Sequence, residues 1–288
     1  MGEAGAGNEK QFKQSFDALH SLCYFVPEVD EELIAAGLRP GRMCYFAGRA
    51  AAMGPVGPGV VAATFYNFNP EVIGRTIPRA WTLATPEQVI AARYVGVDRA
   101  LTRLLGDETL KSDELAEAAE LAREATAGCT VEGRPLYAGH ADLPWPDKSH
   151  LVLWHAVTLL REYRGDGHIA ALVLNGLGGL DALVTHVATG VSFVDAAAKL
   201  TRGWSDEQWD ASVARLREKG ILGEDGLTEQ GRQLRGRIEV ATEAAATGPW
   251  EHLGPEKTAR LEELCGALST QVVAAGAYPA AIFNQGRP

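Results

Sequence analysis

Apolar residues recur at intervals of three and four along most of the chain, a spacing that places them on one face of a helix. The clearest example is the segment 112–127, in which Ser112 is placed to cap a helix. Its inward positions are leucine and alanine, and its other positions are largely charged. Thr85 and Pro86 mark another helix start, with helically spaced apolar residues as far as Leu104. The pattern predicts an all-α fold.

Prolines and glycines divide this helical chain into two parts. The segment 133–146 holds three prolines and is expected to be a long irregular crossing. We therefore predict a multi-helical N-terminal domain over residues 1–145 and a helical C-terminal domain over residues 146–288. In the second domain we expect a helix to about Tyr163, a break at residues 164–167, where two glycines stand, and another helix to about Asn175.

The segment from about residue 181 to 246 has the element order of a winged helix. Helices are expected as far as Gly190, over residues 192–202 and over residues 205–219, where Ser205 and Gln208 form a capping box. Two very short strands, 221–222 and 227–228, would then enclose a tight turn. Thr228 caps the long helix that follows. We predict a winged-helix unit whose two-stranded wing is very short.

The sequence resembles two known families. The run from Val213 to Leu222, followed by Leu227 to Gly231, resembles the recognition-helix end and wing of MarR-like winged-helix regulators. The stretches 159–168, 202–205 and 242–250 are similar to a poorly characterised actinobacterial family of helix-turn-helix proteins. This second resemblance covers most of the chain. It implies a fold and carries no catalytic residues with it.

Composition and charge limit the classes of function. The formal net charge is -10, which repels a nucleic-acid backbone unless basic residues gather on one face. Residues 205–237 hold six basic and seven acidic side chains, and the tip of the expected wing is Gly-Glu-Asp-Gly. DNA is therefore a disfavoured partner, although it is not ruled out. Neither a signal peptide nor a membrane span is recognisable, so we expect a cytoplasmic protein. The four cysteines lack CxxC spacing and are expected to be reduced structural thiols.

Polar residues concentrate where the helix that ends near Tyr163 meets the next one. Arginine forks and the amides of a helix start, with Asp166 as its cap, favour an anionic ligand. His168 with Asp166 or Glu162 would supply an acid–base pair. The alternative is an internal salt-bridge network that fixes the bend. The cluster comprises Trp154, His155, Arg161, Glu162, Tyr163, Arg164, Asp166 and His168.

An aromatic and amide-rich group in the first half is the second candidate for a binding surface. Such residues line pockets for small molecules, but they also build ordinary cores. The group comprises Tyr45, Arg49, Phe65, Tyr66, Asn67, Phe68, Asn69 and Trp81.

The leading hypothesis from the sequence is a protein that binds a small molecule, anionic or aromatic, between its two parts. Arg161, Arg164 and His168 would hold the polar end of the ligand. The remaining ligand-binding residues are expected to be Trp154, His155, Tyr45, Arg49 and Tyr66.

Two other classes of function remain open. One is a ligand-responsive transcriptional regulator, which would act as a homodimer. The other is an enzyme of specialised metabolism with catalytic His168, Asp166 and Glu162. No cofactor is identifiable, and the histidine spacing matches no recognised metal motif.

Overall fold

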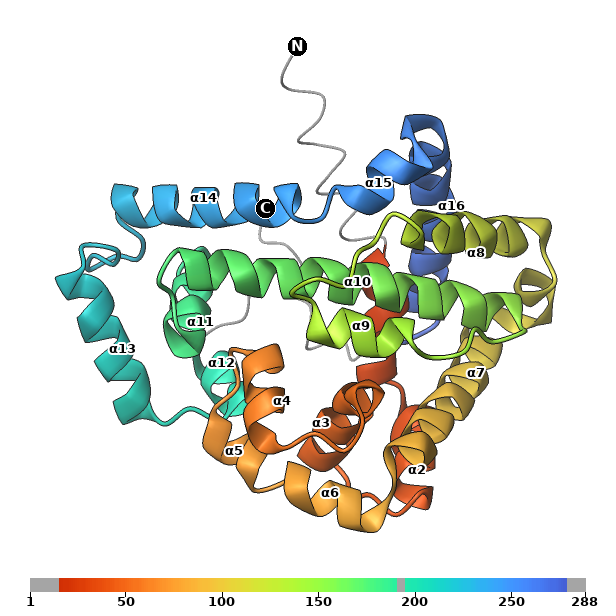
Figure 1. Ribbon diagram of the computed structural model, residues 1–288, viewed down its shortest axis with the longest axis horizontal. Coiled ribbons are helices and arrows are strands. Elements are labelled where there is room, and N and C mark those ends of the chain that lie inside the picture. The colour runs from red at the N-terminus through yellow and green to blue at the C-terminus, as the bar shows by residue number, and fades with distance from the viewer. Residues whose placement is uncertain (1–15, 191–194, 279–288) are drawn as a thin grey trace.

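The computed structural model describes residues 16–190 and 195–278, and this part of the chain is built from helices and their connections (Figure 1). The all-α prediction is confirmed there. The elements are 3₁₀ helix η1 (Leu22–Tyr24), α2 (Pro27–Ala35), α3 (Arg42–Ala50), 3₁₀ helix η2 (Ala51–Met53), α4 (Pro58–Phe65), α5 (Pro70–Gly74), α6 (Ile77–Leu83), α7 (Pro86–Leu110), α8 (Asp113–Thr126), α9 (Pro135–Ala141), α10 (Ser149–Leu174), α11 (Gly179–Val187), α12 (Asp195–Arg202), α13 (Asp206–Glu218), α14 (Glu229–Ala244), α15 (Gly248–Leu253) and α16 (Pro255–Ala274).

Helix starts lie where the capping residues predict them. The Ser112 hydroxyl accepts a hydrogen bond from the Leu115 amide at the start of α8. Thr85 and Ser205 each form a capping box with the glutamine three residues later, at the starts of α7 and α13. Each cap satisfies backbone amides that have no partner within the helix, so these boundaries are fixed locally by the sequence.

Helix α10 crosses the middle of the molecule and is continuous through residues 164–167, so the predicted break is wrong (Figure 1). It packs against α7, α8, α9 and α14. A Cβ at Gly167 would lie 2.9 Å from Nη1 of Arg134 and 3.1 Å from Cβ of Ala245. The missing side chain at Gly167 therefore lets Arg134 and Ala245 pack directly against α10, and the glycine does not interrupt the helix.

The C-terminal half contains helices α11, α12, α13 and α14 in the expected order, but its wing differs from the prediction. In the described residues the wing is one isolated antiparallel bridge between Leu222 and Leu227, so the two-stranded wing is not found. The Gly223 amide donates to the Gly226 carbonyl at 2.8 Å, which closes the hairpin at once. Residues 192–194 of the expected second helix lie outside the described residues.

The hydrophobic cores do not follow the predicted division at residue 145. One core unites residues of α2, α7 and α8 with Leu151–Leu160 of α10 and with α16. Another lies among the end of α10, α11, α13 and α14, and a third among α3, α4, α5, α6 and Leu136. The two-domain division stays a prediction. Helix α10, which follows the predicted boundary, contributes both to the core that contains α7 and α8 and to the core that contains α11, α13 and α14.

Among the described residues, no single helix is both long and apolar enough to cross a membrane. Only α10 taken together with α11, which are bent by 100° at their junction, passes that test by length and composition.

Candidate functional site

A cavity of about 1050 Å³ lies between the N-terminal helices, α10 and the C-terminal helices. Its walls come from α3, α4, the segment after α4, the second half of α10, α11, the end of α12, α14 and α15. The lining includes most of the ligand and catalytic residues that the sequence suggested: Tyr45, Arg49, Tyr66, Arg161, Glu162, Arg164, Asp166 and His168.

Trp154 and His155 lie elsewhere, in the core on the other side of α10. The Trp154 indole donates to the His20 carbonyl at 3.4 Å. His155 hydrogen-bonds through Nδ1 to the Tyr94 hydroxyl at 2.7 Å, and its ring packs edge-on against Trp145. The sequence analysis grouped these two residues with Arg161 and Glu162. Two turns nearer the start of α10, however, they contact Tyr94 of α7 and Trp145 of the chain before α10.

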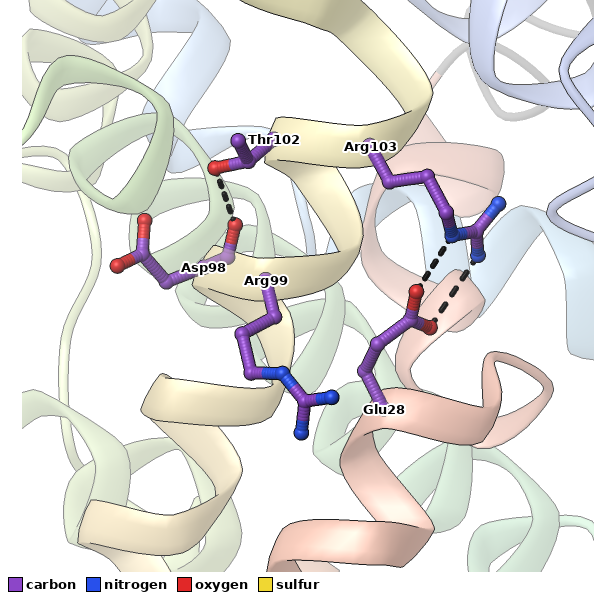
Figure 2. A pocket seen from close by; sticks show the side chains of 5 residues that line it. All are labelled: Glu28, Asp98, Arg99, Thr102 and Arg103. Carbon is purple, nitrogen blue, oxygen red and sulfur yellow. Dashed lines mark hydrogen bonds and ion pairs between the residues drawn. The ribbon is translucent and has the colours of Figure 1, made fainter.

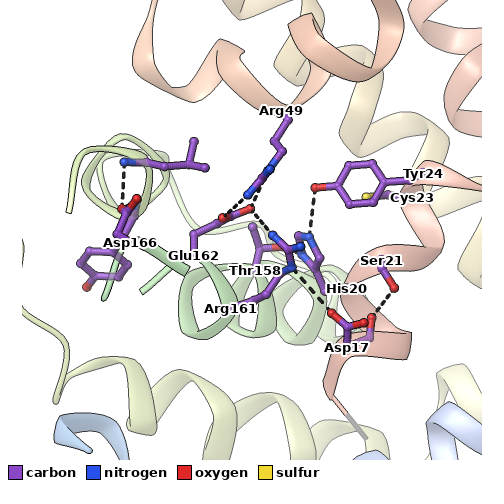
Figure 3. A network of polar contacts seen from close by, with 12 residues as sticks. Asp17, His20, Ser21, Cys23, Tyr24, Arg49, Thr158, Arg161, Glu162 and Asp166 are labelled. Atoms are coloured by element: carbon purple, nitrogen blue, oxygen red, sulfur yellow. Dashed lines mark hydrogen bonds and ion pairs between the residues drawn. The ribbon is translucent and has the colours of Figure 1, made fainter. Parts of the chain in front are cut away.

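A buried ion-pair network lies among the residues that line the cavity (Figure 3). Arg49 of α3 donates to both oxygens of Glu162, from Nη2 at 2.9 Å and from Nε at 3.2 Å. Arg161 donates to the same carboxylate at 2.9 Å. The Glu162 side chain is 1% exposed. Although burial opposes ionisation, the charges of Arg49 and Arg161 hold the pKa of Glu162 well below its ordinary value, so Glu162 is an anion at neutral pH.

The network continues toward the first turn of the described chain. Arg161 lies 3.7 Å from the Asp17 carboxylate, whose side chain is 62% exposed. His20 bridges the Thr158 hydroxyl at 3.0 Å and the Tyr24 hydroxyl at 3.1 Å. Burial, with the nearby charge of Arg161, lowers the pKa of His20, so its imidazole is neutral at pH 7.

Aromatic rings that carry guanidinium groups on their faces also line the cavity. Arg49 lies over the Phe65 ring at 4.5 Å, and Arg202 lies over the Phe68 ring at 4.6 Å. Tyr45 packs against both rings, 5.4 Å from Phe68 and 6.3 Å from Phe65. Stacking on a ring face holds each guanidinium in a fixed plane.

Sequence reasoning missed Arg202. It is the last residue of α12, and no local motif connects it with α3 or α10. Burial lowers its pKa, and the charges of Arg49 and Arg161 lower it further, although an arginine remains protonated at neutral pH. The positive charges of Arg49, Arg161 and Arg202 therefore repel one another around the same cavity.

The α14 side of the cavity has the opposite character. Arg164 donates to Glu239 at 2.8 Å and to Glu243 at 2.7 Å, so two carboxylates already neutralise it. His168 hydrogen-bonds through Nδ1 to the Thr242 hydroxyl at 2.9 Å. Burial lowers the pKa of His168 to about 4, so it is neutral at pH 7.

Asp166 caps a helix, but not the one that we expected. Its Oδ2 accepts hydrogen bonds from the backbone amides of Leu136 at 3.0 Å and Tyr137 at 2.9 Å, which lie in the first turn of α9. Burial raises the pKa of Asp166 to about 6, although these hydrogen bonds favour the ionised form. Within the described chain, His168 shares no hydrogen bond with Asp166 or Glu162.

A smaller surface groove between α2 and α7 carries only charges that neutralise one another (Figure 2). Glu28 pairs with Arg103, and Arg99 pairs with both Glu31 and Glu32. The Asp98 carboxylate is held by Lys148 and His150. The pairs of Glu28, Glu31 and Glu32 hold α2 against α7, and those of Asp98 hold α7 against the start of α10, so each charge that lines the groove has a partner within the protein.

In the described part of the chain, no three His, Cys, Asp or Glu side chains are grouped so that they could hold a metal ion. Cys23, Cys44 and Cys265 are buried free thiols, and Cys129 is a half-buried one.

Comparison with known proteins gives one match. The model of a family described as a helix-turn-helix family matches residues 9–279. No curated protein and no solved structure matches the chain.

Proposed function

We propose that this chain, which belongs to the helix-turn-helix family, binds a small organic molecule, anionic or aromatic, in the cavity beside α10. The cavity volume of about 1050 Å³ lies at the upper end of the range for pockets that enclose drug-sized ligands. Aromatic rings with a few fixed polar groups are the usual lining of such pockets.

The observation that carries this proposal is the convergence of Arg49, Arg161 and Arg202 on one cavity. They come from three helices that are far apart in the sequence. Arginine forks beside aromatic rings suit a ligand that has both a polar end and an apolar body. Apolar side chains at these three positions would stabilise the fold at least as well, so stability alone does not explain the arginines.

Native mass spectrometry of freshly purified protein, followed by denaturing analysis of any released compound, tests the proposal directly. We expect a non-covalent adduct, or a rise in melting temperature with members of a panel of aromatic and carboxylated metabolites. The Arg202→Met variant should lose the shift, and Arg75→Met, the same change at an exposed arginine, should keep it. A protein that binds no member of the panel and carries no adduct would contradict the proposal.

A ligand-responsive transcriptional regulator is the second candidate. One segment, residues 66–69, connects the cavity with the start of α11 and with the turn between α12 and α13. Tyr66, Asn67 and Phe68 line the cavity. The Tyr66 hydroxyl also donates to the carbonyl of Leu177, just before α11, at 2.6 Å.

The same segment holds the turn between α12 and α13. The Asn69 amide donates to the Arg202 carbonyl at 2.9 Å, and the Asn69 side chain donates to the Gly203 carbonyl at 2.9 Å. The Trp204 indole donates to the Asn67 carbonyl at 2.9 Å. A ligand that moves the segment 66–69 would therefore move α13 as well.

The charge on α13 argues against tight DNA binding by this helix. Its first turns expose Asp206, Glu207 and Asp210, where a recognition helix contacts bases and phosphates. Arg215, farther along the helix, pairs with Asp181. A gel-shift assay with random duplex DNA at 20–50 mM salt decides between the candidates. We expect no retardation, whereas a salt-sensitive shift by a homodimer would favour the regulator.

A further inference from the structure

We infer that the ligand of this cavity is an uncharged aromatic compound whose polar end, a carbonyl-type oxygen, accepts a hydrogen bond from Arg161. The ring of this ligand lies against Tyr45 and Tyr66. The inference rests on the proposed function and specifies the chemical class of the ligand. It follows from the charges that line the cavity, from the partners that these charges already have, and from one arginine donor that remains accessible.

Acidic and basic side chains line the cavity in nearly equal number. The five basic ones are Arg49, Arg161, Arg164, Arg202 and Arg235, and the six acidic ones are Asp17, Glu162, Asp166, Glu239, Glu243 and Glu262. The histidines of the lining add no charge at pH 7, because burial lowers the pKa of His168 to about 4 and also lowers the pKa of His186. The lining therefore has no positive excess that would attract an anion.

Each arginine of the lining also has a partner within the protein. The Glu162 carboxylate accepts hydrogen bonds from both Arg49 and Arg161. Two carboxylates of α14 hold Arg164. The remaining two contact rings: Arg202 stacks on Phe68 at 4.6 Å, and Arg235 lies 3.5 Å from Nδ1 of His186. A carboxylate ligand would lose its hydration and compete with these partners, so its charge would be poorly compensated in the cavity.

Carboxylates stand along the whole of α10 that faces the cavity, so an anion is repelled at either end. Glu162 and Asp17 lie beside Arg161. Asp166 follows one turn later, and at pH 7 its pKa of about 6 leaves it ionised. A cation fares no better, because the guanidiniums of two arginines already lie over the rings of Phe65 and Phe68.

Arg161 keeps one donor for an uncharged acceptor (Figure 3). Its Nη1 donates to Glu162 at 2.9 Å, and its Nε lies 3.7 Å from the Asp17 carboxylate. Within the described residues Nη2 donates no hydrogen bond, and the side chain is 33% exposed. A carbonyl oxygen at Nη2 would gain a charge-assisted hydrogen bond without adding a charge. Of the residues that the sequence suggested for the polar end of the ligand, this assignment keeps Arg161 alone.

Two half-buried tyrosines of the lining offer contacts to an aromatic ring. Tyr45 is held in place by the buried rings of Phe65 and Phe68. Tyr66 is fixed by the hydrogen bond from its hydroxyl to the Leu177 carbonyl, and its φ of 49° is rare for a residue with a side chain. Strained backbone of this kind is concentrated at ligand-binding segments.

The test compares four naphthalenes in NMR titrations of the full chain at pH 7. They are 2-acetylnaphthalene, an uncharged ketone; 2-isopropenylnaphthalene, its isostere without the oxygen; the anion 2-naphthoate; and the cation 2-naphthylmethylammonium. We expect wild type to bind the ketone at least about 10-fold more tightly than each of the other three, the ratio for one charge-assisted hydrogen bond or one poorly compensated charge.

Variants of Arg161 test its role as the donor. Arg161→Met should abolish the preference for the ketone over the alkene, and Arg161→Lys should keep part of it. The surface control Arg75→Met should leave the preference unchanged. Circular dichroism would verify that each variant is folded.

The outcomes separate this inference from the proposed function. A carboxylate or an ammonium that binds as tightly as the ketone, or more tightly, would overturn the uncharged class while the proposed function stands. Equal binding of ketone and alkene to wild type would overturn the carbonyl assignment. An unchanged preference in folded Arg161→Met would remove Arg161 from the site. If none of the four compounds binds, this inference fails, and native mass spectrometry decides the proposed function separately.

Discussion

Replacement of Glu162 by glutamine is the sharpest test of the buried network. The variant keeps the shape of the side chain but leaves Arg49 and Arg161 without their shared carboxylate. Removing one partner of a buried ion pair costs about 3–5 kcal/mol, because the charge left behind is uncompensated. The exposures indicate which charge dominates this cost. Arg49 is 11% exposed and bears most of it, whereas Arg161, at 33%, regains some solvation.

Urea unfolding at pH 7, followed by circular dichroism at 222 nm, measures this loss. The control is Glu117→Gln, which breaks an exposed pair with Arg260 and should cost only a small fraction as much. Wild type and variant should show equal m-values, so that the midpoints report stability alone. A loss below about 1 kcal/mol for Glu162→Gln would refute the view that this carboxylate stabilises buried arginines.

The pH dependence gives an independent check with a definite sign. The folded pKa of Glu162 lies well below 4.5, the ordinary value for a glutamate. The stabilisation by Glu162 is therefore complete above pH 4.5 and is lost as the pH falls from there through the folded pKa. The difference between wild type and Glu162→Gln should be constant from pH 6 to 7 and should shrink below pH 4.5. A difference that grows on acidification would contradict the assignment.

Three further predictions address the helix contacts and the buried histidine. Gly179→Ala places a Cβ 1.9 Å from the Tyr66 carbonyl oxygen and should cost about 1–3 kcal/mol in urea unfolding, whereas Gly178→Ala, with no atom within 4 Å, should be nearly neutral. Asp166→Ala removes the carboxylate that caps α9 and should lower the free energy of unfolding by about 0.5–2 kcal/mol. Asp166→Asn keeps an acceptor oxygen and should lower it less, so equal losses in the two variants would disprove the capping role. Because the folded pKa of His168 is about 4, the unfolded chain binds more protons below pH 6.5, so stability should fall between pH 6.5 and 4 and His168→Gln should flatten this slope.

The parts of the fold that the sequence predicts correctly depend on short-range chemistry. Ser112, Thr85 and Ser205 cap helices through atoms only three residues away, so the pattern suffices to locate those helix starts. The same holds for the order of the helices in the C-terminal half. The prediction of a two-stranded wing was wrong. The turn 223–226 closes so tightly that the two flanking segments form a single bridge, between Leu222 and Leu227.

The errors arise where residues distant in sequence decide the outcome. Gly167 suggested a helix break, but its lack of a side chain makes room for Arg134 and Ala245. Asp166 was predicted to cap a helix that starts beside it, but its carboxylate accepts hydrogen bonds from the first-turn amides of α9, about 30 residues earlier in the chain. The cavity shows the same limit. Local polarity pointed to the charged residues that α3 and α10 contribute, whereas Arg202 joins them because the end of α12 folds back against the segment after α4.

The packing of α16 against α7 and α8 has a consequence for how the chain acquires its structure. Leu261, Leu264, Leu268 and Val272 complete a core that begins with residues near Leu19. During synthesis, the apolar side chains of the first helices that pack against α16 therefore remain exposed to water until more than 200 further residues have left the ribosome. Nascent chains halted before α16 should associate with general chaperones and be degraded readily by proteases, and release of the last helix should end both behaviours together.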